Sequence, residues 1–128
     1  PSKVATVDVN CIPDGFSIVD IGPRTVGRFF DKLSSCKTVI WNGPLGIFEY
    51  DTFAKGTTEV ANILASLDAV TVIGGGSTGE AVESLGLSDR MSHVSSGGGA
   101  MLEFLEGKEL PGIAALPAKA APRLHSME

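Results

Sequence analysis

The chain has 128 residues, of which 43% are apolar, and a formal charge of −5. This acidic balance and the absence of a Lys/Arg cluster argue against a nucleic-acid partner, because phosphate neutralisation needs concentrated positive charge. No apolar run approaches membrane-spanning length and nothing at the start resembles a cleaved signal, so we expect a soluble protein with no membrane partner. The predicted location is cytoplasmic, with an organellar location as the alternative. Cys11 and Cys36 lack the close pairing of a zinc or redox motif and are expected to be reduced.

The first third of the chain predicts two strands and a helix. Val4–Val9 alternates weakly and Phe16–Ile21 is a second apolar run, with a turn signal between them. Gly22-Pro23 ends the extended chain, and Thr25 is a candidate cap for the helix that follows. The inward face of that helix is spaced i, i+3, i+4, i+7 and consists of Val26, Phe29, Phe30 and Leu33.

From there strands alternate with helices. Strands are predicted at Lys37–Trp41, at Ala69–Ile73 and around His93-Val94. The first is almost continuously apolar, as expected where helices cover both sheet faces. Helical faces are predicted between and after them, formed by Val60, Ile63, Leu64 and Leu67, by Ala81, Val82 and Leu85, and by Met101, Leu102, Phe104 and Leu105.

This alternation predicts an α/β fold, as part of a parallel, Rossmann-like three-layer sheet domain. Ile113–Leu116 is expected to add one edge strand. Residues 1–116 are predicted to form the domain part, and residues 117–128 a tail whose order depends on another surface.

Two glycine triplets stand out, Gly74-Gly75-Gly76 and Gly97-Gly98-Gly99, each between an apolar run and a helical pattern. Without a Cβ the backbone can approach a ligand closely, and the first N–H groups of a helix have no partner within the helix. The positive end of the helix dipole also favours anions. Two such corners at one sheet edge could hold one polyphosphate, although tight turns alone would also explain the glycines.

A second candidate region is the loop Asn42–Glu49, at the carboxyl end of a predicted strand, where open α/β sheets bind ligands. Asn42 can donate to a phosphate oxygen, and Glu49 can accept from a ribose hydroxyl. Pro44 and Ile47 could line an apolar slot for a base. Each of these residues is also of a type that commonly serves turns, solvated surface or core.

The first triplet allows two other interpretations. Gly74, Gly76 and Gly79 formally match the dinucleotide fingerprint, which would predict NAD binding, but the acidic residue expected about 20 positions later is absent. Ser77 and Glu80 have the spacing of a capping box. No Gly-Lys-Ser/Thr follows the glycines, so the segment is not a P-loop.

Four groups of motifs together resemble phosphoglycerate kinase. They are Asp20-Ile21-Gly22-Pro23, Trp41-Asn42-Gly43-Pro44-Leu45-Gly46-Ile47-Phe48-Glu49, Gly74-Gly75-Gly76, and His93-Val94-Ser95-Ser96-Gly97-Gly98-Gly99-Ala100, followed by Leu105-Glu106-Gly107-Lys108 and Leu110-Pro111-Gly112. The similarity runs from about Ile12 to Ala115 and corresponds to roughly the last third of that family, the latter part of its nucleotide-binding domain.

The resemblance implies a glycolytic enzyme that moves a phosphoryl group between 1,3-bisphosphoglycerate and ADP, with ATP/ADP and Mg²⁺ as its cofactors. It places Glu49 on the ribose and Pro44 in the base pocket. It places Asn42 and the corner Gly74, Gly75, Gly76, Ser77 and Thr78 on the phosphates. The amides of Gly97, Gly98 and Gly99 would face the phosphoryl group in transfer, so Gly76, Gly98 and Gly99 are the candidate catalytic positions.

The resemblance also implies what this chain does not supply. The family's phosphoglycerate pocket and the lysines that neutralise the moving phosphoryl group lie in sequence upstream of Pro1. The chain alone is therefore expected to be inactive, and an alternative is a stand-alone or degenerate nucleotide-binding module without turnover. Ser77 stands where the family carries a metal-binding aspartate, so Mg²⁺ affinity is expected to fall. Ile18 replaces a small residue and is expected to narrow the base slot.

Overall fold

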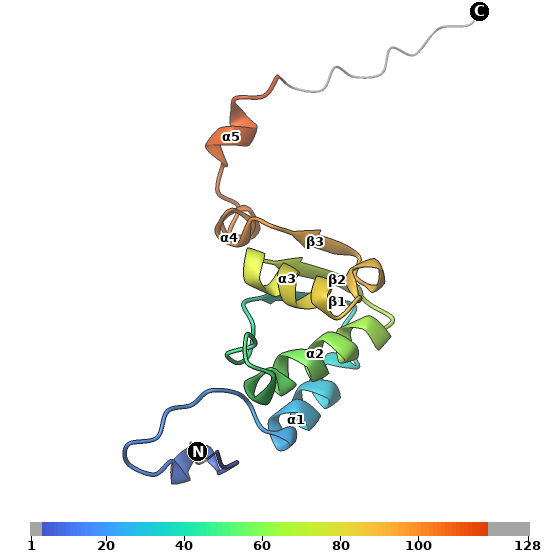
Figure 1. Ribbon diagram of the computed structural model, residues 1–128. Coiled ribbons are helices and arrows are strands. Elements are labelled where there is room, and N and C mark those ends of the chain that lie inside the picture. Colours follow the sequence, from blue (N-terminus) through green and yellow to red (C-terminus); the bar gives the residue numbers. More distant parts are fainter. Residues whose placement is uncertain (1–3, 118–128) are drawn as a thin grey trace, which may run out of the picture. The chain divides into compact units, whose positions relative to one another are not determined.

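The computed structural model describes residues 4–117 (Figure 1). The chain divides into two compact units, Pro1–Gly98 and Gly99–Glu128, and each is described by itself. The predicted boundary at residue 116 stays a prediction, and most of the predicted tail, residues 118–128, lies outside the described residues.

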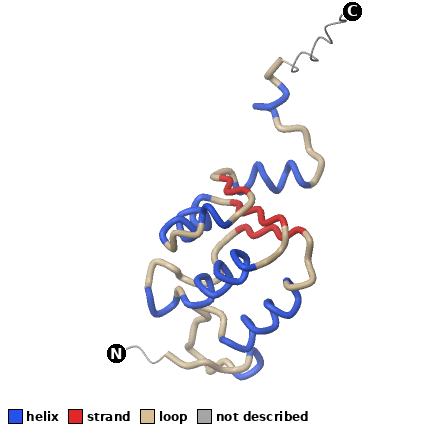
Figure 2. The backbone as a smooth tube through the Cα atoms, turned by 90° about the vertical axis from the view of Figure 1, so that its right-hand side faces the viewer, coloured by secondary structure: helices blue, strands red, loops and turns tan. Residues whose placement is uncertain are grey.

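A three-stranded parallel sheet forms the centre of the first unit. Its strands are β1 (Thr38–Asn42), β2 (Val70–Gly74) and β3 (His93–Ser95), in the order β1-β2-β3 (Figure 2). The three strands were predicted to within two residues, and the α/β class with a parallel Rossmann-like sheet is confirmed. Because consecutive strands are parallel and adjacent, a helix must return the chain across the sheet after each of the first two.

These crossover helices are α2 (Lys55–Ser66) and α3 (Gly76–Ser84). Both pack on the sheet face that carries alternate residues of β1 and β2, as the period of two in a strand requires. The buried cluster contains Val39, Trp41, Val60, Ala61, Leu64, Ile73, Val82 and Met91. Two short 3₁₀ turns, Asp51–Phe53 (η2) and Ser88–Arg90 (η3), complete the connections.

The opposite sheet face is largely exposed in this unit. Ile40 on β1 is 43% exposed and Val70 on β2 is 51% exposed, although both are apolar. His93 on β3 aligns with Val72 and is also exposed. The continuous apolar run of β1 indicates a strand that is covered on both faces, and within the described chain only one of its faces is buried.

Helix α1 (Pro23–Leu33) forms where predicted, but its cap differs from the prediction. The N-cap residue is Gly22 and Pro23 occupies the first helical position, so Thr25 lies inside the helix. Proline fits this position because its N–H would have no partner there and its φ is already helical. No residue of α1 is fully buried, and only Leu33 of its predicted inward face packs against the core cluster.

The two strands predicted before α1 do not form. Residues 4–22 are irregular apart from a short 3₁₀ turn, Val9–Cys11 (η1). Alternating apolar residues favour a strand only where a neighbouring strand shares a ladder of hydrogen bonds with them, and neither segment joins the sheet of the described chain. Ile18 accordingly remains 72% exposed.

The second unit contains all of α4 (Gly98–Leu105) except its first residue, and α5 (Pro111–Ala114). The edge strand predicted at Ile113–Leu116 is wrong, because this segment belongs to α5 and the turn that ends it. Pro111 at the first helical position starts that short helix. Among residues 4–117 no helix is long and apolar enough to cross a membrane.

Candidate functional site

The carboxyl ends of the three strands meet in register at one edge of the sheet. Asn42, the last residue of β1, pairs with Gly74, the last of β2, and Gly74 pairs with Ser95, the last of β3. This alignment follows from parallel pairing, which brings equivalent strand ends to one side. Both glycine triplets therefore leave the sheet at the same edge as the Asn42 loop, which is where α/β sheets bind ligands.

Gly75 forms the first corner. Its backbone has φ 90° and it is the N-cap of α3, with no side-chain cap hydrogen bond. A Cβ at this position would lie 2.8 Å from Asn42 Oδ1, so the position requires glycine for both its conformation and its space.

Gly98 brings the second corner into contact with the first. A Cβ on Gly98 would lie 2.9 Å from the Gly75 Cα and 3.0 Å from Asn42 Oδ1. The Asn42 amide nitrogen also lies 3.5 Å from the Gly98 carbonyl oxygen, a weak hydrogen bond. Two segments more than 20 residues apart thus touch backbone to backbone beside one asparagine. The structure brings Asn42, Gly74, Gly75 and Gly98 together as predicted.

The first turn of α3 presents its amides at this corner. The first hydrogen bond into the helix runs from the Gly79 N–H to the Gly75 carbonyl, at 3.0 Å. The N–H groups of Gly76, Ser77 and Thr78 precede that bond, so they have no carbonyl partner within the helix. The capping-box interpretation is wrong, because Ser77 lies within the helix and no side chain caps it.

The Thr78 side chain connects this corner to the loop after β1. Its side chain is fully buried, and its Oγ1 accepts a hydrogen bond from the Gly43 N–H at 2.8 Å. The hydroxyl therefore ties the first turn of α3 to the loop after β1. A contact between Thr78 and a phosphate at this corner would come from its backbone N–H.

The loop after β1 is held by alternate backbone amides. Besides Gly43, the Leu45 N–H donates to Thr57 Oγ1 at 3.1 Å and the Ile47 N–H donates to the Val19 carbonyl at 3.0 Å. The Trp41 indole N–H donates to the Gly43 carbonyl at 2.7 Å. Residues 43–47, which we call the β1 loop, are thus hydrogen-bonded to α2, to α3 and to the segment before α1.

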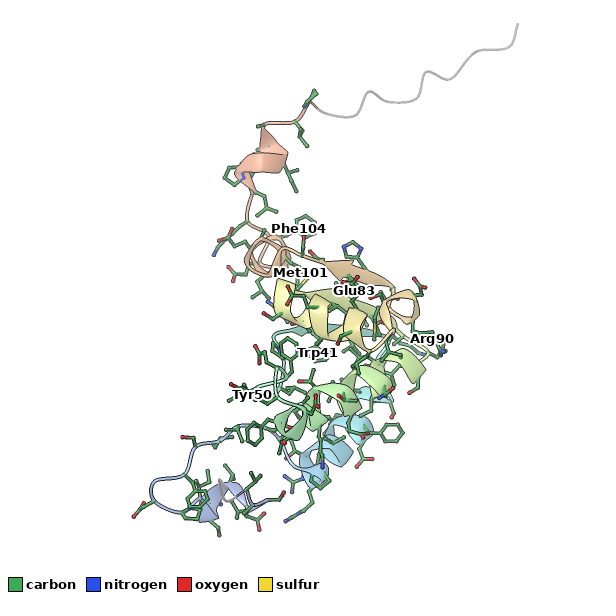
Figure 3. All side chains as sticks on the ribbon, viewed as in Figure 1. Trp41, Tyr50, Glu83, Arg90, Met101 and Phe104 are labelled. Atoms are coloured by element: carbon green, nitrogen blue, oxygen red, sulfur yellow. The ribbon has the colours of Figure 1, made fainter. Side chains whose placement is uncertain are left out.

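The predicted base and ribose residues lie in or just after this loop. Pro44 is half-buried, Ile47 is 43% exposed, and the side chain of Glu49 is exposed. Figure 3 labels Trp41 and Tyr50, which stand just before and just after the segment Asn42–Glu49. Within residues 4–117, the Glu49 carboxylate makes no hydrogen bond to the glycine corner.

The residues of the second triplet differ in their surroundings. The Gly97 N–H donates to Ser95 Oγ at 3.2 Å, which fixes the turn out of β3. Gly98 makes the contacts described above, and Gly99 is the first residue of the second unit. Of this triplet, Gly98 is the residue whose backbone lies against the first corner.

The corner fits a phosphate group better than it fits a metal ion. Its close backbone approach and unpaired amides suit an anion. Ser77 offers an exposed hydroxyl but no negative charge, and hard divalent cations prefer carboxylate ligands. Among residues 4–117, no three His, Cys, Asp or Glu side chains are grouped closely enough to hold a metal.

Comparison with known proteins identifies the family. The family model for phosphoglycerate kinase matches residues 1–108. The chain belongs to the phosphoglycerate kinase family. It is 58% identical over 118 residues to phosphoglycerate kinase from Clostridium botulinum, covering 92% of this chain and 29% of that protein. It is 59% identical over 116 residues to phosphoglycerate kinase from Trichodesmium erythraeum, covering 90% of this chain and 29% of that protein.

Solved structures agree with this assignment. Phosphoglycerate kinase from Coxiella burnetii matches with a TM-score of 0.77 and 41% identity, over 84% of this chain and 28% of that one. Phosphoglycerate kinase from Pyrococcus horikoshii matches with a TM-score of 0.73 and 40% identity, over 80% of this chain and 25% of that one. The chain thus spans less than a third of the length of the phosphoglycerate kinases it matches.

Sequence reasoning missed two residues that shape the site. Thr57 was not singled out, and Asp20 appeared only within a quoted motif, yet both hydrogen-bond to backbone at the β1 loop or beside it. One signal could have pointed to a distant capping residue such as Asp20. Helix α2 begins after Ala54, whose side chain cannot accept a hydrogen bond from the first amides of the helix. A helix start without a local cap needs an acceptor from elsewhere.

Proposed function

We propose that this chain is the carboxyl-terminal part of a phosphoglycerate kinase nucleotide-binding domain and that its glycine corner binds the phosphates of ADP and ATP. The observation that carries this proposal is the contact of Gly75 with Gly98 beside Asn42, at strand ends that lie in register. Such a corner can bind a polyphosphate, because its backbone N–H groups can donate to phosphate oxygens and no side chain blocks their approach.

The remaining roles follow in the same proposal. Asn42 donates its amide to a phosphate oxygen, and the N–H groups at Gly76, Ser77 and Thr78 face the phosphates. Pro44 and Glu49 contact the base and ribose. Gly97, Gly98 and Gly99 face the phosphoryl group in transfer, where backbone dipoles that are already oriented stabilise developing charge without reorganising.

In the whole enzyme the reaction would convert ADP and 1,3-bisphosphoglycerate to ATP and 3-phosphoglycerate, as a cytoplasmic step of glycolysis. None of the proposed site residues of this chain is a lysine or an arginine. Phosphoryl transfer requires charge neutralisation, so we expect this chain alone to bind nucleotide without turning it over. Phosphoglycerate would bind only through sequence that this chain does not contain. Mg²⁺ would arrive with the nucleotide, and Ser77 would contribute at most a hydroxyl.

The test is a calorimetric titration of the chain with ADP, ATP and NADH, with and without Mg²⁺. Saturable ADP binding that NADH does not compete away supports the proposal. Saturable NADH binding that ADP cannot displace would instead support the dinucleotide interpretation of Gly74, Gly76 and Gly79. No saturable binding of any of the three would reject a nucleotide site in this chain.

A second candidate function is nucleotide binding without turnover in any context. Ser77 favours this candidate. The resemblance implies a metal-binding aspartate at this position, and a serine hydroxyl brings no negative charge to hold Mg²⁺. Joining the upstream part of a relative to this chain separates the two. ATP formation by the joined protein supports the kinase, and a folded, ADP-binding but inactive product supports the binding module.

A further inference from the structure

We propose that Asp20 is a positioning residue for the nucleotide, acting through the β1 loop rather than by touching the ligand. The inference rests on the proposed function, in which this loop contacts the base and ribose. Asp20 is half-buried in the irregular segment before α1, 22 positions ahead of Asn42.

The Asp20 carboxylate binds two backbone amides at once. Its Oδ1 accepts from the Ile21 N–H at 2.8 Å, and its Oδ2 accepts from the Gly56 N–H at 2.9 Å. Gly56 is the second residue of α2, whose N-cap Ala54 supplies no side-chain cap. Asp20 therefore caps α2 from 36 residues away, and its charge lies at the end of the helix that favours anions.

The same carboxylate supports the β1 loop. A Cβ on Gly46 would lie 2.6 Å from Asp20 Oδ1 and would also overlap the Phe53 carbonyl. The loop backbone therefore rests directly on the carboxylate. The next residue, Ile47, donates its N–H to the carbonyl of Val19, the residue before Asp20.

Two adjacent residue pairs thus join the loop to this segment, Val19 to Ile47 and Asp20 to Gly46. Gly56 is likewise close-packed on Asp20, since a Cβ there would overlap Oδ1. One carboxylate therefore sets the distance between the β1 loop and the start of α2. The glycine corner at Gly75 and Gly98 contacts Asn42, and none of its contacts involves Asp20.

This arrangement predicts a selective effect on affinity. Displacing residues 46 and 47 of the β1 loop changes the contacts of Pro44, Ile47 and Glu49 with base and ribose. Gly43, at the other end of the loop, stays hydrogen-bonded to Thr78, so the amides that face the phosphates keep their places. Loss of Asp20 should therefore weaken ADP but not inorganic pyrophosphate, which has no base or ribose. A residue needed only for stability would weaken both ligands equally.

The test is Asp20→Asn in the full chain, with Asp31→Asn on the exposed side of α1 as the matched control. Asparagine has one acceptor oxygen, so it can satisfy only one of the two N–H groups that Asp20 binds. We expect the ADP dissociation constant to rise about tenfold, the size typical of a lost hydrogen bond to a charged group, with pyrophosphate affinity changed by less than about twofold. Equal weakening of both ligands, or unchanged ADP affinity, would overturn the proposal.

Amide hydrogen exchange provides a second readout that needs no ligand. In Asp20→Asn the N–H groups of Gly56 and Ile47 should exchange faster, while those of Val60 and Leu64 in the middle of α2 stay protected. Unchanged exchange at both Gly56 and Ile47 would also overturn the proposal. If the unmodified chain bound neither ligand, the proposed function would fail, and the positioning role would be decided by this exchange alone.

A second variant covers the case in which Asp20→Asn does not fold. Gly46→Ala forces the loop away from an intact carboxylate, and Gly27→Ala, where a Cβ meets nothing within 4 Å, is its control. Gly46→Ala should reproduce the selective loss of ADP affinity. Retention of ADP affinity equal to that of the control would contradict the proposal.

Discussion

The contact between Gly98 and Gly75 can be tested by adding one methyl group. In Gly98→Ala the new Cβ would lie 2.9 Å from the Gly75 Cα, 3.0 Å from Asn42 Oδ1 and 3.3 Å from the Gly75 nitrogen. Non-bonded carbon atoms attract best at about 3.5–4.0 Å, so the two corners must separate by at least about 0.6 Å. The atoms that must move are mostly backbone, which cannot rotate out of the way.

Overpacking of this kind typically costs about 1–3 kcal/mol. If the corner stays closed, the cost appears as reduced stability of the free protein. If the corner opens, the phosphate amides separate and the cost appears as reduced affinity, which corresponds to an ADP dissociation constant raised between about 5-fold and about 150-fold. The two measurements together should account for the full cost.

Both quantities can be measured on the same sample. Trp41 is the chain's single tryptophan and is only 7% exposed, so its fluorescence reports urea unfolding of the sheet and its helices. Calorimetry then gives the ADP affinity. Gly27→Ala is the control, because an added Cβ there meets nothing within 4 Å. A Gly98→Ala variant with the stability and the ADP affinity of the control would refute the close approach of the two corners.

Three further predictions concern other side chains. Thr78→Val removes the acceptor of the Gly43 N–H and should lower the free energy of unfolding by about 1–3 kcal/mol in urea titrations, because the amide is left without a partner. Leu64→Ala, at a side chain that is 1% exposed, should lower it by about 2–5 kcal/mol, whereas Leu116→Ala, at one that is 67% exposed, should leave the urea midpoint almost unchanged. Ser77→Asp should increase the dependence of ADP affinity on Mg²⁺ in calorimetry, and an unchanged dependence would show that the metal does not bind at this position.

The elements that sequence reasoning predicted well are those set by local pattern. Helix α2 carries an apolar period that matches its burial, as in Val60 and Leu64, and strands β1 and β2 formed where short apolar runs predicted them. The glycine corners were also predictable, because glycine between a strand and a helix permits the positive φ and the close backbone approach that such a turn needs. The segments predicted wrongly, Val4–Val9 and Ile113–Leu116, are apolar runs whose strand character depends on a pairing partner that local pattern cannot reveal.

The functional residues divide in the same way. Asn42 and Gly75 were predicted because strand ends in parallel sheets converge. Asp20 and the hydroxyl roles of Thr57 and Thr78 were not, because each acts on a backbone amide between 12 and 36 positions away. Side chains that bind distant backbone leave no spacing signal, and only the three-dimensional structure reveals them.

The glycine corner is proposed to bind phosphate through backbone N–H groups, and this affects what a serine at position 77, in place of the family's aspartate, should change. In the proposed site, the amides of Gly76, Ser77 and Thr78 would attract phosphate through their own dipoles, and a change of side chain at Ser77 leaves those dipoles in place. A metal ion depends on side-chain charge instead. Replacing a carboxylate with a hydroxyl at this position should therefore separate two properties that an aspartate would couple, keeping affinity for the nucleotide's phosphates while weakening the preference for its magnesium complex. Because Asp20 is proposed to act through the β1 loop on the base and ribose end of the same ligand, positions 77 and 20 should affect metal preference and base recognition independently.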